Sequence, residues 1–169
     1  AAVRQGLRDF VPEPHRIADL GTVRGIRWVD DSKATHPHAA QASLAAFEHV
    51  VWVAGGLLKG ADVDELVAGA AHRLRGVVLI GRDRSAISEA LARHAPDVPV
   101  VDVAQTDTGA MDAVVAHALD LAQTGGVECL SDGVGEPTGL GDRQVARVGT
   151  GARHDVPAEL GAGLGHADR

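Results

Sequence analysis

The stretch 30–35 places two carboxylates, two hydroxyls and one ammonium between an apolar segment and a run of helix-forming residues. The segment 26–29 predicts a strand, and the run 37–47 predicts a helix with Thr35 as its N-cap. Free N–H groups at the start of a helix, together with the positive end of its dipole, favour an anionic ligand. Lys33 adds a full positive charge, so this turn suits a phosphate or a carboxylate.

A second cation, Lys59, follows a pair of glycines at the end of another apolar segment. Both features also have a purely structural interpretation, because Asp, Ser and Thr commonly cap helices and a lysine in a glycine turn is often simply solvated. His36 and His38 stand two positions apart, which on a helix directs them to different faces. We therefore expect no metal site there.

The composition limits the classes of protein to consider. A length of 169 residues allows one domain with a sizeable core, and the net charge of −7 argues against a nucleic-acid-binding surface. The single cysteine, Cys129, is compatible with a reducing cytoplasm and is expected to pack as a small hydrophobe. No apolar run approaches the roughly 20 residues of a membrane span. We therefore expect a cytoplasmic monomer with neither a nucleic-acid nor a membrane partner.

Short apolar segments that alternate with helical patterns predict an α/β fold. Strands are expected at 26–29, 49–54, 76–81 and 98–103 and from residue 127 onward, and helices at 1–10, 37–47, 62–74, 84–94 and 109–123, with Asp83 capping the helix at 84. This order implies a doubly wound, Rossmann-like three-layer domain with a mainly parallel sheet of five or six strands. Ligands gather at the carboxyl ends of such strands, where Asp31 and Lys59 stand.

Three short segments, in a specific order and spacing, resemble the C-terminal domain of the Mur ligases. These segments are Pro14–Arg16, Asp31–Thr35 and Gly55–Gly60. The sequence is most similar to the members that add D-glutamate to UDP-N-acetylmuramoyl-L-alanine in peptidoglycan biosynthesis. The resemblance therefore implies an ATP-dependent amide ligase, in which ATP phosphorylates a carboxylate and the amine of D-glutamate attacks the acyl phosphate.

The resemblance also implies a division of the chain. Residues 1–18 would be the end of a central domain and a hinge, and residues 19–130 the amino-acid-binding domain. Residues 131–169 are rich in glycine and lack periodicity, so we expect an aberrant, disordered tail. The chain opens in a helical pattern without a starting methionine. We therefore expect a fragment that has no turnover by itself, with Mg²⁺ held mainly by residues outside it.

The resemblance also implies roles for six residues of the three segments. The implied roles are nucleotide binding for His15, Arg16 and Asp31, catalysis for Lys33, and substrate binding for Thr35 and Lys59. Asp31 would accept hydrogen bonds from the ATP ribose, Arg16 would reach the nucleotide phosphates, and Lys59 would pair with a carboxylate of D-glutamate. These roles agree with electrostatics, because a polyphosphate and a dianionic amino acid both need cations and helix N-termini.

Two other α/β classes fit the sequence less well. A phospho-receiver domain also has paired acids after its first strand, but it needs an Asp at the end of its third strand, where Ile80 and Gly81 stand. An NAD-binding module needs a Gly-x-Gly-x-x-Gly turn, and the segment 55–60 lacks that spacing. A non-catalytic remnant, or a stand-alone nucleotide-binding module, stays open as an alternative.

Overall fold

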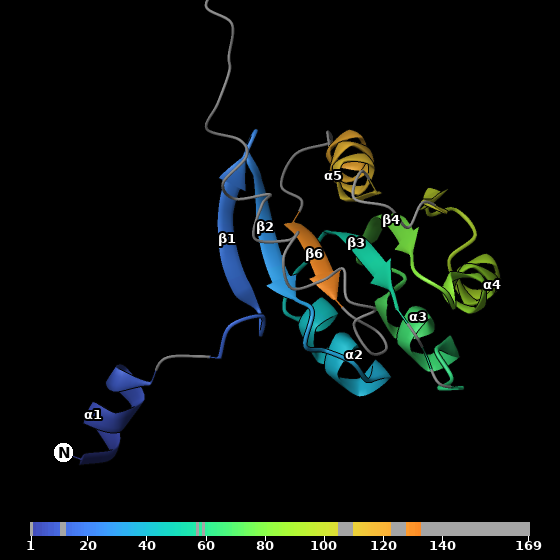
Figure 1. Cartoon of the computed structure of the whole chain (residues 1–169). Coiled ribbons are helices and arrows are strands. Elements are labelled where there is room, and N and C mark those ends of the chain that lie inside the picture. Colours follow the sequence, from blue (N-terminus) through green and yellow to red (C-terminus); the bar gives the residue numbers. More distant parts are fainter. Residues whose placement is uncertain are drawn as a thin grey trace, which may run out of the picture.

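The computed structural model describes residues 2–10, 13–56, 58, 60–104, 110–122 and 128–132. Within these residues the chain forms one six-stranded sheet with helices on both of its faces (Figure 1). The strands are β1 (Ala18–Val23), β2 (Ile26–Asp31), β3 (Val50–Gly55), β4 (Leu74–Ile80), β5 (Val100–Asp102) and β6 (Glu128–Asp132). The helices are α1 (Ala2–Asp9), α2 (Pro37–Ala45), α3 (Asp64–Ala70), α4 (Arg84–His94) and α5 (Ala110–Leu121).

The strands lie in the order β1-β2-β6-β3-β4-β5. All neighbouring pairs are parallel except β1 and β2, which form an antiparallel hairpin at one edge. The last described strand, β6, lies between β2 and β3. These two strands precede the segments that carry Lys33 and Lys59, and one strand therefore separates them. This arrangement confirms the predicted Rossmann-like α/β domain with a mainly parallel sheet.

Two apolar clusters fill the spaces between the sheet and its helices. Helices α2, α3 and α4 cover one face around Trp52, and α5 covers the other face around Trp28 (Figure 1). Every residue of β3 is buried, as expected for a central parallel strand covered on both faces. Cys129 is buried in the second cluster, which confirms that it packs as a small hydrophobe.

The hairpin strand β1 was not predicted from the sequence. Its residues are exposed or half-buried, as expected at a sheet edge, so the segment lacks the apolar run that marks the central strands. Arg24 and Gly25 connect it to β2, with φ values of 53° and 79°. Positive φ at both central residues is typical of the tight two-residue turns that join antiparallel strands.

One expected helix end and one expected helix cap were wrong. Helix α3 ends at Ala70, and Leu74, which was assigned to the helix, instead begins β4 and pairs with Val50. Helix α2 is capped by His36, which has extended dihedrals and no side-chain capping bond, so Thr35 is not the N-cap. The residue before a proline is pushed out of the helical region, which explains why the helix begins at Pro37.

The two ends of the described chain differ in their relation to the sheet. Helix α1 lies apart from the sheet (Figure 1), and Val3 in this helix and Phe10 just after it are exposed. At the other end, β6 runs to Asp132, two residues beyond the expected end of the domain. The remainder of the expected tail, residues 133–169, lies outside the described residues.

Candidate functional site

The segment 13–17, here called the hinge segment, lies against residues 30–35, here called the strand-end loop. The backbone N–H of Lys33 donates to the carbonyl of His15 at 3.2 Å. The ring Nδ1 of His15 lies 2.6 Å from Asp30 Oδ2, and the N–H of Ile17 donates to Asp31 Oδ1 at 3.0 Å. These contacts fasten the hinge segment to the carboxyl end of β2.

The hinge backbone is held in an unusual conformation. His15 and Ile17 have φ values of 64° and 47°, a left-handed region that costs residues with a Cβ about 1–2 kcal/mol each. The contacts with Asp30, Asp31 and Lys33 compensate for this cost. Arg16 stands between the two constrained residues, so its backbone position is fixed from both sides.

Two carboxylates at the end of β2 are almost completely buried, with Asp30 2% and Asp31 4% exposed. Asp30 accepts a hydrogen bond from the N–H of Ser32 at 2.9 Å in addition to its contact with His15. Asp31 accepts a hydrogen bond from the hydroxyl of Ser43 as well as from Ile17. Because a buried charge without partners is strongly unfavourable, these contacts are what allows both acids to stay at the end of the strand.

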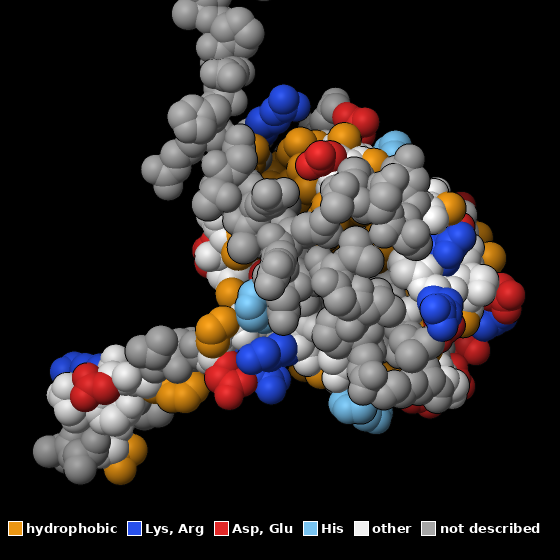
Figure 2. Space-filling model, viewed as in Figure 1, with side chains coloured by type: hydrophobic (Ala, Val, Ile, Leu, Met, Phe, Trp, Pro, Cys, Tyr) orange, Lys and Arg blue, Asp and Glu red, His pale blue; other side chains and the backbone are white. Residues whose placement is uncertain are grey.

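Two exposed cations of the site contact one exposed acid. Arg16 Nε lies 3.1 Å and Lys33 Nζ 3.6 Å from Glu13 Oε2. The hydrogen bond from Arg16, followed by the charge of Lys33, holds the pKa of Glu13 below its usual value. Figure 2 shows cationic and acidic side chains side by side where the segment that follows α1 meets the body of the domain.

The structure brings together four of the six residues assigned from the sequence. His15, Arg16, Asp31 and Lys33 all belong to the contact between the hinge segment and the strand-end loop. Thr35 is half-buried in the same loop, and its N–H donates to the carbonyl of Lys33 at 2.9 Å. Lys59 lies outside the described residues.

Other groups in the site were missed from the sequence. Asp30 and Glu13 were not assigned a role, although they hold His15, Arg16 and Lys33. Ser43 was also missed, and the one available signal was a polar residue at helical spacing from the buried Ala40. The Oγ atom of Ser32 is buried and makes no hydrogen bond in the part of the chain that the structure describes, which leaves a donor for a bound oxygen atom.

The sequence of this chain matches a known class of enzyme domain. Residues 15–131 match the family "Mur ligase, glutamate ligase domain", which covers more than half of the chain. The chain therefore belongs to the Mur ligase family, as its sequence segments predicted.

Three similar relatives share one name. The chain is 66% identical over 125 residues to the UDP-N-acetylmuramoylalanine–D-glutamate ligase of Streptomyces coelicolor, an alignment that covers 74% of this chain and 26% of the relative. It is 68% identical over 124 residues to the ligase of the same name from Thermobifida fusca (73% and 27%), and 53% identical over 126 residues to that of Mycobacterium tuberculosis (72% and 25%). The chain thus spans about a quarter of the length of these curated relatives.

Two further findings concern membrane spans and metal ligands among the described residues. Among them, no helix is long and apolar enough to cross a membrane. The same residues contain no group of three or more His, Cys, Asp or Glu side chains arranged to hold a metal ion.

Proposed function

We propose that this chain is the amino-acid-binding part of an ATP-dependent ligase that adds D-glutamate to UDP-N-acetylmuramoyl-L-alanine in peptidoglycan biosynthesis. The observation that carries the proposal is the contact between the hinge segment and the strand-end loop. The contact brings together two exposed cations, Arg16 and Lys33, and its backbone is fixed by the buried carboxylates of Asp30 and Asp31. Both cations meet the exposed acid Glu13, and a more highly charged phosphate can replace that acid as their partner.

ATP supplies the phosphoryl group that activates the carboxylate of the muramoyl substrate. Arg16 would neutralise negative charge on the nucleotide phosphates. Lys33 would stabilise the charge that develops on the acyl group when the amine of D-glutamate attacks. The constrained backbones of His15 and Ile17, together with the hydrogen bond from Lys33 to His15, fix the backbone positions that carry these cations, which lowers the cost of ordering them on binding.

The polar side chains of the strand-end loop suit the sugar of a nucleotide. A carboxylate offers about four lone-pair positions, of which Asp31 uses one for Ser43 and one for Ile17. We propose that the remaining positions accept the ribose hydroxyls. Ser32 contributes a buried hydroxyl without a partner in the described structure. Thr35, two residues beyond Lys33, would contact the acceptor amino acid.

Further partners follow from the same proposal. Lys59 would pair with a carboxylate of D-glutamate, and Mg²⁺ would be held mainly by residues outside this chain. We also propose a cytoplasmic monomer without nucleic-acid or membrane partners, which is supported by the net charge of −7 and the single cysteine. Because the chain spans about a quarter of its relatives, we expect it to have no turnover by itself.

A chimera tests the proposal directly. Residues 15–131 of this chain would replace the glutamate ligase domain of the Streptomyces coelicolor relative, and ADP release would be measured with each substrate omitted in turn. We expect turnover that requires both D-glutamate and UDP-N-acetylmuramoyl-L-alanine, and none when the domain is deleted. A folded chimera that ignores D-glutamate, or that prefers another amino acid, would show that the proposed acceptor is wrong.

A further inference from the structure

The turns that follow β3 and β4 touch each other along their backbones. Gly55 pairs with Ile80, and a Cβ built on Gly55 would lie 2.0 Å from the carbonyl oxygen of Ile80. A Cβ on Gly81, whose φ is 80°, would lie 2.6 Å from the nitrogen of Gly56. Since no side chain fits between the two turns, the position of one determines the position of the other.

Asp83, at the start of α4, joins the two turns. Its backbone N–H donates to the carbonyl of Gly56 at 3.2 Å, and its Oδ2 accepts a hydrogen bond from the N–H of Leu58 at 2.7 Å. The sequence predicted that Asp83 caps α4, but its side chain makes no capping bond with that helix. The carboxylate is instead committed to the neighbouring turn, 25 residues earlier in the chain.

Leu58 is held at three points. Its N–H is bound to Asp83, its side chain is buried in the cluster under α2, α3 and α4, and its carbonyl accepts a hydrogen bond from Ala61 at 2.9 Å. Gly60, with a φ of 79°, provides the reversal of the chain before Ala61. The residues on both sides of Lys59 in the sequence therefore have fixed backbones.

We propose that Asp83 is a positioning residue for the acceptor amino acid. By holding the N–H of Leu58, it fixes the point at which the chain leaves toward Lys59. The inference rests on the proposed function, in which Lys59 pairs with a carboxylate of D-glutamate. Since Asp83 acts through this turn and not through the hinge segment, its loss affects the use of D-glutamate and not that of ATP.

The test measures both Michaelis constants in the chimera described above. Asp83→Ala removes the acceptor for Leu58, whereas Asp83→Asn keeps an oxygen in the same place. We expect Asp83→Ala to raise the KM for D-glutamate about threefold to tenfold, the effect of one hydrogen bond, with the KM for ATP changed less than twofold. Asp83→Asn should restore most of the loss.

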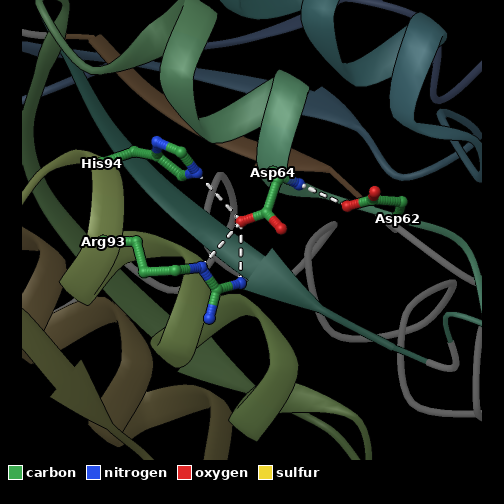
Figure 3. A network of polar contacts seen from close by, with 4 residues as sticks. All are labelled: Asp62, Asp64, Arg93 and His94. Carbon is green, nitrogen blue, oxygen red and sulfur yellow. Dashed lines mark hydrogen bonds and ion pairs between the residues drawn. The ribbon is translucent and has the colours of Figure 1, made fainter.

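A matched control lies at the start of the preceding helix. Asp62 accepts a hydrogen bond from the N–H of Asp64 at 2.9 Å, the same kind of contact as that between Asp83 and Leu58 (Figure 3). Asp62→Ala therefore removes a carboxylate and leaves the N–H of Asp64 without this acceptor, while the contact between Asp83 and Leu58 stays intact. We expect it to leave both Michaelis constants unchanged.

The outcomes separate the inference from the function on which it rests. A wild-type chimera that does not use D-glutamate overturns both. An active chimera in which Asp83→Ala leaves the KM for D-glutamate unchanged, or raises both constants equally, overturns the positioning role alone. Should Asp83→Ala fail to fold, Asp83→Glu takes its place, because one added methylene displaces the carboxylate from Leu58.

Hydrogen exchange in the 169-residue chain gives a readout that does not depend on activity. We expect the amide of Leu58 to exchange about tenfold faster in Asp83→Ala than in the wild type, and at nearly the wild-type rate in Asp83→Asn. The amide of Val53, in the centre of the sheet, serves as the internal reference. Unchanged exchange at Leu58 would show that Asp83 does not hold the turn.

Discussion

Ser43, in α2, donates a hydrogen bond to Asp31 at the end of β2, and the two side chains are only 3% and 4% exposed. The other oxygen of Asp31 accepts the N–H of Ile17 in the hinge segment. One buried carboxylate therefore connects a helix, a strand end and the hinge segment. The conformation of the hinge depends on α2 as well as on the loop that it touches.

Replacing Ser43 by Ala should destabilise the domain. The change leaves Asp31 buried with one partner fewer, and an unsatisfied buried acceptor costs about 1–3 kcal/mol, more when it is charged. Urea unfolding followed by circular dichroism measures this difference. Ser88→Ala, at an exposed position of α4, is the matched control and should stay within about 0.5 kcal/mol of the wild type.

The hydroxyl of Ser43 has an alternative acceptor, which defines the opposite outcome. Its Oγ lies 3.2 Å from the carbonyl of Ala39, one turn earlier in α2, and a hydroxyl has only one proton to donate. A Ser43→Ala variant as stable as the wild type would indicate that the proton is directed to Ala39 and that Asp31 does not depend on it.

Removing Asp30 should loosen the hinge segment. In Asp30→Ala, His15 loses its partner, so its carbonyl is held less firmly against the N–H of Lys33. We expect the amide of Lys33 to exchange about tenfold faster, the change that follows from a loss of about 1.4 kcal/mol in opening free energy. Hydrogen exchange followed by NMR gives this rate for each residue.

Asp19→Ala is a closely matched control for this change. Like Asp30, Asp19 accepts the N–H of the residue two positions later, Gly21, and pairs with a basic side chain, Arg27. Its contacts lie on β1 and β2, away from the hinge segment. An equal rise in the exchange rate of the Lys33 amide in both variants would mean that the domain opens as a whole. Asp30 would then not specifically stabilise the hinge segment.

Much of the fold was predictable because central parallel strands are apolar along their whole length. β3 and the apolar part of β4, residues 77–80, could be recognised for this reason, since both of their faces are covered. The edge strand β1 could not, because its half-exposed residues show no comparable run. The end of α3 was predicted four residues too late. Leu74 fits the apolar spacing of the helix, but its backbone pairs with Val50 in the sheet.

The grouping of residues in the candidate site was predictable only where they are close in the sequence or belong to the family segments. His15, Asp31 and Lys33 were assigned to one site in this way, and the structure places them in one contact. Ser43 and Asp83 were not, because their contacts depend on how α2 and α4 pack against the sheet. Neighbouring residues in the chain give no sign that a hydroxyl in a helix will meet a carboxylate twelve positions earlier.

A polar cluster between α3 and α4 should contribute to stability in a pH-dependent way. Asp64 Oδ1 lies 2.7 Å from Arg93 and 3.0 Å from His94 (Figure 3). The hydrogen bond from Arg93 is the main cause that lowers the pKa of Asp64 below its usual value of 3.8; partial desolvation opposes this shift, and His94 adds to it. Because the pKa is lower in the folded state, the contribution is present above about pH 4 and is lost as the pH falls through the folded pKa.

Urea midpoints at pH 6 and pH 3 test this contribution. We expect the midpoint to fall less between these pH values in Asp64→Asn than in the wild type, and the difference to shrink in high salt because the groups are exposed. Asp97→Asn is the control, since Asp97 is exposed and takes part in no ion pair in the described part of the chain. An Asp64→Asn variant with the same pH dependence as the wild type would contradict the prediction.

Arg16→Ala and Lys59→Ala should separate the two halves of the proposed site in the chimera. The side chain of Arg16 is 58% exposed, and among the described residues it pairs with the exposed Glu13 alone. Its removal should therefore leave the fold intact and raise the KM for ATP about tenfold through the loss of one charge-assisted contact. Lys59 follows Leu58, whose N–H is bound by Asp83. Loss of the proposed pairing between Lys59 and a carboxylate should raise the KM for D-glutamate about tenfold to a hundredfold. Steady-state kinetics with one substrate varied at a time measures both effects. If Lys59→Ala leaves the constant for D-glutamate unchanged, Lys59 is a solvated turn residue; if Arg16→Ala raises both constants equally, the hinge segment does not favour the nucleotide.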